Sequence, residues 1–116
     1  QVLASVIGRY PARGALLVDA GALALSKDRS TQAAPNDWQF GRVLDRDGQA
    51  ALGEAMVVRV HQEHGEVRGA PVERLPVGAR VRIAPNHACL TAAAHQRYYV
   101  VEGGKIVAEW GRVNGW

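Results

Sequence analysis

Short apolar segments separated by turn-forming residues are the feature that most limits how this chain can fold. Each segment is followed within three residues by glycine, proline or aspartate, and the segments recur roughly every ten to fifteen residues, which is typical of β-strands. Fifteen valines against a single phenylalanine favour a β-rich core of branched aliphatic side chains. The predicted strands are Val2–Arg9, Ala15–Ala20, Phe40–Leu44, Met56–Gln62, Ala79–Ala84, Arg97–Glu102 and Lys105–Trp110.

Side-chain alternation assigns faces to two of these segments. Val81 and Ile83 alternate with arginines, which is the period of a half-buried strand. Val58 and Val60 alternate with polar residues in the same way. The polar stretch Lys27–Asp37 is predicted to be a loop.

The last two segments are joined by Gly103-Gly104, two residues that adopt the positive φ values of a tight β-hairpin. Ala88–Ala94 is the helical candidate, with Asn86 as its expected N-cap. The pattern predicts a mainly β fold: a small antiparallel β-barrel or sandwich with one or two short helices.

Length, charge and cysteine count narrow the class of protein. The 116 residues make one domain, and the net charge of +3 comes from arginines that are scattered along the chain. We therefore interpret the positive charge as dispersed and solubilising, in preference to a nucleic-acid-binding surface. We expect no membrane partner, since no apolar run reaches the length of a spanning helix. A single cysteine favours a reducing compartment. These features predict a soluble, cytoplasmic domain.

The segment Pro85–Cys89 is the sharpest chemical feature. It directly follows a predicted strand, so His87 and Cys89 are expected at a sheet edge, with both side chains on the same side of extended backbone. An imidazole and a thiolate together favour zinc, and two protein ligands leave coordination positions open for a substrate. The alternative is that Cys89 is a small buried hydrophobe and His87 a loop hydrogen-bond donor.

Two further sites have a chemical and a structural interpretation. His61 and His64 bracket Glu63, which could orient His64 as a general acid or base; the alternative is an exposed polar strand end before Gly65. Asp19 interrupts an apolar stretch and needs a partner, either a backbone amide at the following turn or an arginine.

These motifs, in this order, resemble a known family. The ordered set is 18–21 (VDAG), 24–28 (ALSKD), 62–65 (QEHG), 77–78 (VG), 85–89 (PNHAC) and the closing hairpin from Tyr98. It resembles the C-terminal β domain of the D-serine dehydratase and D-threonine aldolase family, which are pyridoxal-phosphate (PLP) enzymes with an alanine-racemase-like fold. The resemblance covers residues 1–116 as a single domain. One departure is Leu23, where many relatives carry lysine.

The resemblance implies a metal-assisted lyase. In the dehydratase branch the His and Cys of this motif hold zinc beside the cofactor, which matches His87 and Cys89. The aldolase branch usually has Asp in place of the cysteine and uses a harder ion, so Cys89 favours the dehydratase. The implied reaction is loss of the β-hydroxyl from a D-amino-acid substrate, giving a keto acid and ammonia. Retro-aldol cleavage is the alternative within the family.

The resemblance also implies what this chain lacks. The family binds PLP through a lysine of an N-terminal barrel domain, and that barrel is absent from these 116 residues. We therefore expect a domain that is inactive alone, that works with the barrel of the same polypeptide, and that belongs to a homodimer. His64 and Glu63 are predicted to face the His87 site as catalytic residues. The alternative from another class is a stand-alone basic β-barrel that binds an anionic partner.

Overall fold

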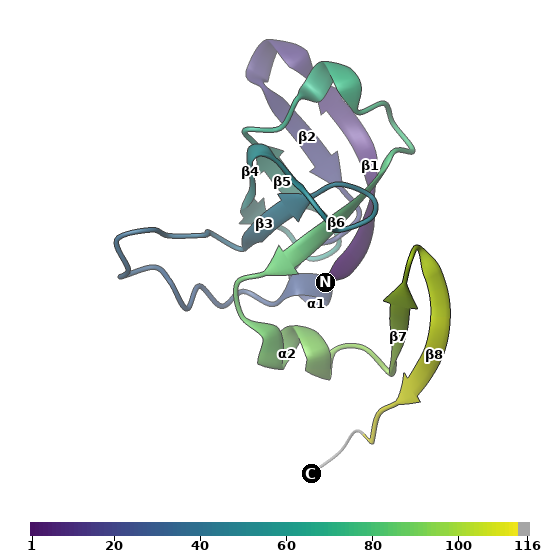
Figure 1. Cartoon of the computed structure of the whole chain (residues 1–116). Helices are drawn as coiled ribbons and strands as arrows, with labels where there is room; N and C mark the ends of the chain where they lie inside the picture. Colours follow the sequence, from purple (N-terminus) through teal and green to yellow (C-terminus); the bar gives the residue numbers. More distant parts are fainter. Residues whose placement is uncertain (114–116) are drawn as a thin grey trace.

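The computed structural model describes residues 1–113 of the chain. Within that range, eight strands form most of the regular structure, and two short α-helices and two 3₁₀ turns lie between them (Figure 1). The strands are β1 (Val2–Tyr10), β2 (Ala15–Val18), β3 (Gly41–Leu44), β4 (Ala51–Val60), β5 (Gly65–Arg68), β6 (Arg80–Pro85), β7 (Arg97–Glu102) and β8 (Lys105–Gly111). The helices are α1 (Ala22–Leu25) and α2 (Ala88–Ala93), with 3₁₀ turns η1 (Pro11–Arg13) and η2 (Val72–Arg74).

Six of the strands close into a barrel. Their order is β1-β2-β5-β4-β3-β6, and every neighbouring pair is antiparallel. Closure leaves none of these six strands as a free edge. The predicted mainly β class, with a small antiparallel barrel and two short helices, is confirmed.

The core of the barrel is aliphatic. Val81 and Ile83 of β6 are 1% and 0% exposed, as their alternation predicts. Val57 is 0% exposed, whereas Val58 and Val60 are only half-buried. The register of β4 on β5 shifts between Val57 and Arg59, and a bulge of this kind reverses which side chains face inward. Val60, which follows the bulge, packs against the core as predicted, whereas Val58 does not. The prediction of an inner face was therefore right for Val60 and wrong for Val58.

The hairpin of β7 and β8 is a separate two-stranded sheet beside the barrel (Figure 1). Gly103 and Gly104 have φ values of +55° and +77°, so both take the positive φ of a type I′ turn, as predicted. The hydroxyl of Tyr98 donates to the carbonyl oxygen of Ala92 at 2.9 Å, which attaches the hairpin to α2.

The sequence pattern missed β5 and α1, which have four residues each. Both are fixed by close backbone packing. A Cβ on Gly21 would lie 2.5 Å from the carbonyl oxygen of His61 and from the amide nitrogen of His64, and one on Gly65 would lie 2.7 Å from the carbonyl oxygen of Ala20. Only glycine lets the 18–21 and 62–65 turns approach this closely.

Loop and membrane predictions have clear outcomes in the described residues. Lys27–Asp37 contains neither helix nor strand, as expected. Between residues 1 and 113 there is no helix long and apolar enough to cross a membrane.

Candidate metal centre

His87 and Cys89 lie where β6 gives way to α2. His87 is the N-cap residue of α2, with extended backbone at φ −122° and ψ 110°, and Cys89 is the second residue of the helix. The expectation that both lie on one extended segment at a sheet edge was wrong, because the chain turns into α2 between them. The thiol of Cys89 is exposed, so the alternative of a buried hydrophobic cysteine is excluded. His87 and Cys89 are still only two positions apart in the chain, and both are accessible to solvent.

One ring nitrogen of His87 is already engaged. Its Nδ1 lies 2.6 Å from Oδ2 of Asp28, and the two side chains are 31% and 44% exposed. When the carboxylate accepts the Nδ1 proton, the Nε2 lone pair is left available as a ligand. A histidine held in this way by a carboxylate is the usual arrangement of a metal-binding imidazole.

Asn86 was predicted to cap α2 and does not. Its side-chain amide instead donates to Thr31 Oγ1 at 2.8 Å and to the carbonyl oxygen of Gln39 at 2.6 Å. Thr31 in turn donates to Asp37 Oδ1 at 3.0 Å. Asn86 comes one residue before the helix cap, and it ties the 26–40 loop to the end of β6.

An ion pair joins the two limbs of the same loop. Arg29 pairs with Asp37, whose side chain is 19% exposed. Burial acts to raise the pKa of the Asp37 carboxyl, but hydrogen bonds from Arg29, the Gln39 amide and Thr31 outweigh it and lower the pKa. The carboxylate therefore stays charged, and the loop is held in place beside His87.

Helix α1 packs against α2 through polar contacts. Thr91 is 5% exposed, and its Oγ1 lies 2.8 Å from the carbonyl oxygens of both Leu25 and His87. His95 is half-buried, with Nε2 3.3 Å from the carbonyl oxygen of Ala24. Leu23, the departure from the family pattern, is 59% exposed on α1.

The 61–64 turn lies at the other end of α1. The amides of Ala22 and Leu23 donate to the carbonyl oxygens of His61 and Gln62 at 2.7 and 3.2 Å, so this turn supplies acceptors for the first N–H groups of the helix.

Asp19 has a backbone partner, because its Oδ1 accepts a hydrogen bond from the Ser5 amide at 2.6 Å. The expected acceptor role of Asp19 is confirmed, with a different amide from the one proposed.

Within the described chain no hydrogen bond joins Glu63 to His64. Glu63 is exposed and accepts a hydrogen bond from Gln62 at 3.2 Å, while the half-buried His64 ring stacks on His61 with centroids 4.5 Å apart. An orienting contact from Glu63 to His64 is thus not present in this structure. Their participation in the His87 site stays a prediction.

The donor set fits an open metal site better than a closed one. Among residues 1–113 there is no cluster of three or more His, Cys, Asp or Glu side chains arranged to hold an ion. His87 and Cys89 offer one nitrogen and one sulfur donor, a combination of ligand types that suits zinc. For PLP the chain offers no match, since its two lysines, Lys27 and Lys105, are both exposed.

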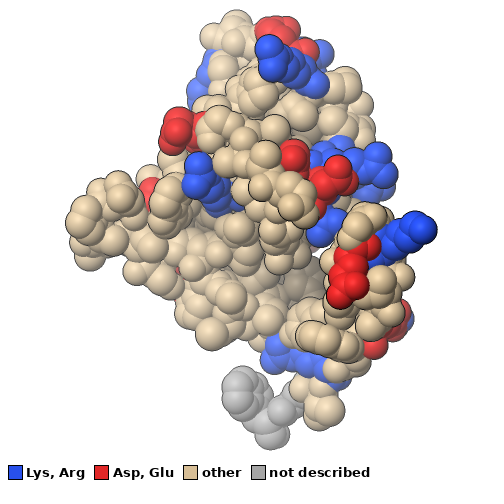
Figure 2. Space-filling view, in the orientation of Figure 1, with Lys and Arg blue, Asp and Glu red and all other residues tan. Residues whose placement is uncertain are grey.

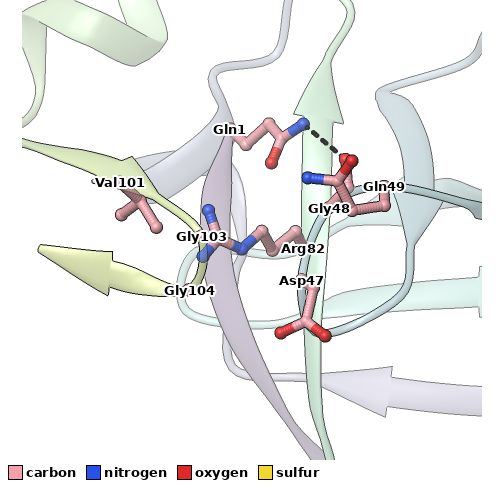
Figure 3. A pocket seen from close by; sticks show the side chains of 8 residues that line it. All are labelled: Gln1, Asp47, Gly48, Gln49, Arg82, Val101, Gly103 and Gly104. Atoms are coloured by element: carbon pink, nitrogen blue, oxygen red, sulfur yellow. Dashed lines mark hydrogen bonds between the residues drawn. The ribbon is translucent and has the colours of Figure 1, made fainter.

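The grooves of the described surface lie elsewhere. One of about 660 Å³ opens between the β7–β8 turn and the barrel, where Arg82 points toward Gly103 and Gly104 (Figure 3). Another of about 630 Å³ lies between the hairpin, β1 and α2 and reaches Thr91 and His95. Neither is lined by His87 or Cys89. On the face shown in Figure 2, acidic and basic side chains are interspersed.

Comparison with known proteins agrees with this architecture. The family model described as "Putative serine dehydratase domain" matches residues 1–101. A D-threo-3-hydroxyaspartate dehydratase of Delftia sp. is 38% identical over 100% of this chain and 32% of its own length. A D-serine dehydratase of Schizosaccharomyces pombe is 35% identical over 99% of this chain and 27% of its own length. The chain thus spans about a third or less of these enzymes.

A shorter relative also matches. An uncharacterized protein of Mycobacterium tuberculosis is 30% identical over 94% of this chain and 77% of its own length. Domains of this kind therefore occur both within long enzymes and in a protein not much longer than this chain.

Solved structures show the same fold. An alanine-racemase-like protein from Idiomarina loihiensis has a TM-score of 0.89 at 39% identity, covering 99% of this chain and 31% of its own. The Delftia dehydratase gives 0.89 at 38% identity, covering 99% of this chain and 32% of its own. A D-threonine aldolase from Filomicrobium marinum is more distant, with 0.67 at 28% identity over 95% of this chain and 26% of its own.

Two structures of the Delftia dehydratase are substitution mutants. One replaces a cysteine with alanine and is described as metal-free, and the other replaces with alanine a histidine two positions before that cysteine. His87 and Cys89 have the same spacing. With its barrel, its motifs and a family match over residues 1–101, this chain belongs to the serine dehydratase domain family.

Proposed function

We propose that this chain is the metal-bearing domain of a PLP-dependent lyase that eliminates the β-hydroxyl of a D-amino acid, in the manner of a D-serine dehydratase. The observation that carries the proposal is the His87–Cys89 pair at the start of α2, with Nδ1 of His87 held by Asp28. The equal spacing of the two positions substituted in the Delftia dehydratase supports it.

The ligand types favour zinc over a harder ion. Nε2 of His87 and Sγ of Cys89 would hold the metal, and a thiolate selects zinc over manganese or magnesium. Zinc in such a site supplies Lewis-acid polarisation of a hydroxyl. The greater similarity to the Delftia dehydratase than to the D-threonine aldolase favours elimination over retro-aldol cleavage.

The rest of the active site belongs to other parts of the proposed enzyme. PLP would be held by an N-terminal barrel domain of the same polypeptide, because neither lysine of this chain is buried. We place His64 and Glu63 in the same site as acid–base residues, and we propose a cytoplasmic homodimer. In this arrangement the domain contributes the metal and cannot catalyse alone.

Zinc binding by the 116-residue chain tests the metal assignment. We expect one zinc ion per chain in the wild type, and loss of that ion in both His87→Ala and Cys89→Ala. Cobalt(II) substituted for zinc should give a thiolate charge-transfer band in the wild type and in His95→Ala, and no such band in His87→Ala or Cys89→Ala. Unchanged zinc content in His87→Ala would refute the assignment. His95→Ala is the matched control, since it removes a half-buried histidine away from Cys89.

The product made by the gene in its source cell tests the enzyme assignment. We expect a protein several times heavier than 12.5 kDa with the visible absorption of bound PLP. It should release pyruvate and ammonia from D-serine. If the protein instead released glycine and acetaldehyde from D-threonine, its reaction would be retro-aldol cleavage and the proposed elimination would be wrong. A colourless product of about the mass of this chain would refute the lyase proposal and favour a stand-alone domain.

A further inference from the structure

The contact between Asp28 and His87 brings together residues that are 59 positions apart in the chain, at an Nδ1–Oδ2 distance of 2.6 Å. This distance is at the short end of charge-assisted hydrogen bonds. Both side chains are partly exposed, and an exposed pair of this kind contributes little to stability. Stability alone therefore gives a weak reason for the contact, and its effect on the imidazole is a stronger one.

The backbone at Asp28 is anchored on both sides. Ser26 ends α1 at a φ of +69°, and its Oγ accepts the Asp28 amide at 3.1 Å. The next residue, Arg29, is paired with Asp37, and Asn86 fixes the same loop to the end of β6. The backbone of Asp28 is thus held between two anchored points, from which its side chain reaches His87.

Asp28 is placed behind the imidazole rather than beside Cys89. It contacts Nδ1, and within the described residues it forms no three-ligand cluster with His87 and Cys89. A carboxylate on the far ring nitrogen fixes the tautomer and the rotation of the ring.

We propose that Asp28 is a positioning residue that fixes His87 in the Nδ1–H tautomer and directs Nε2 at the metal. This inference rests on the proposed zinc function of His87 and Cys89. It assigns a role to the aspartate of the 24–28 motif, which the sequence pattern alone left without one. Loss of the carboxylate should weaken zinc binding about 10- to 100-fold, as for other partners of metal-bound histidines.

The test measures zinc affinity of the 116-residue chain by competition with a chromophoric chelator, and the His87 tautomer by nitrogen-15 NMR without metal. We expect Asp28→Ala to lose affinity and to lose the Nδ1–H signature of His87. Asp28→Asn keeps a carbonyl acceptor at the same place, so it should retain the tautomer and recover part of the affinity.

Two matched controls separate positioning from loop integrity and from charge. Asp37→Asn weakens the loop anchor without touching His87, and Asp47→Ala removes an exposed aspartate of the β3–β4 turn. Both should bind zinc within about twofold of the wild type, since neither is a partner of a ligand.

The outcomes distinguish this inference from the proposed function. If the wild type binds zinc, His87→Ala does not, and Asp28→Ala has the wild-type affinity and tautomer, Asp28 has no positioning role and the metal site stands. If the wild type and His87→Ala bind zinc equally, the metal assignment itself fails. An affinity loss in Asp37→Asn as large as in Asp28→Ala, with the Nδ1–H tautomer of His87 retained in both variants, would assign the effect to the loop and overturn the inference.

Discussion

Replacing Thr91 with valine should destabilise the chain, because it removes the hydroxyl that joins α2 to α1. Thr91 is 5% exposed, and its Oγ1 lies 2.8 Å from the carbonyl oxygens of Leu25 and His87. The hydroxyl has one proton, so it donates fully to one carbonyl at a time. The contact to His87 is the ordinary bond from a helical threonine to the residue four positions before it, whereas the contact to Leu25 joins the two helices.

The magnitude follows from what valine leaves behind. Valine has nearly the volume of threonine, so no cavity term applies. The Leu25 carbonyl, however, loses its side-chain donor in a buried place, and such an unsatisfied group costs about 1–3 kcal/mol. For a domain of this size each kcal/mol corresponds to roughly 4 °C or more in melting temperature.

Chemical denaturation of Thr91→Val and Thr91→Ser measures this effect. We expect the valine variant to lose about 1–3 kcal/mol, and the serine variant to lose less because it retains the hydroxyl and gives up only one methyl group. A serine variant less stable than the valine variant would show that packing of the methyl group, and not the hydrogen bond, joins α2 to α1. That result would refute the reasoning.

Further changes test the interlocked turns and one acid-sensitive turn. Gly21→Ala should lower the free energy of unfolding by about 1–3 kcal/mol or more, because its Cβ would lie 2.5 Å from backbone atoms of His61 and His64. Backbone cannot move aside as a flexible side chain can. An unchanged midpoint of chemical denaturation would contradict this prediction. The pKa of the Asp45 carboxyl is lowered, chiefly because it accepts the Gln49 amide. Its stabilisation is therefore present above the unfolded pKa of about 3.9 and is lost as the pH falls through the folded pKa. Asp45→Ala should have a lower melting temperature than the wild type at pH 7 and the same melting temperature near pH 2. A difference in melting temperature that persists near pH 2 would contradict the assignment.

The barrel could be predicted from the sequence because its strands carry local signals. Gly103-Gly104 and the Val81–Ile83 alternation each describe their own surroundings, and both agree with the structure. The β4 face could not be read in the same way, since the bulge after Val57 depends on pairing with β5. One extra residue in a strand exchanges the inward-facing and outward-facing positions beyond it, and the local sequence pattern does not reveal where that residue is.

The candidate ligands could be proposed from the local sequence, but the contacts that support them could not. His87 and Cys89 stand two positions apart, so their chemistry is visible locally. Asp28 and Thr31 reach this region from about 55–59 positions away, through a loop that has no periodicity. Asn86 is a second example. Its position in the sequence suggested a helix cap, but its side chain donates a long-range hydrogen bond to the carbonyl oxygen of Gln39.

Helix α1 gives a physical reason to expect His64 and Glu63 near the His87 site. The 61–64 turn bonds the first amides of α1, and Thr91, one turn of helix beyond His87, bonds its last carbonyl. Four helical residues span only about 6 Å. If the two turns share one site, cobalt(II) bound at His87 should strongly broaden the ring signals of His64, since one bridging residue or water reaches no further than about 10 Å. Sharp His64 signals in the cobalt-loaded chain would remove both His64 and Glu63 from the site, and α1 would then act only as a spacer between two independent turns.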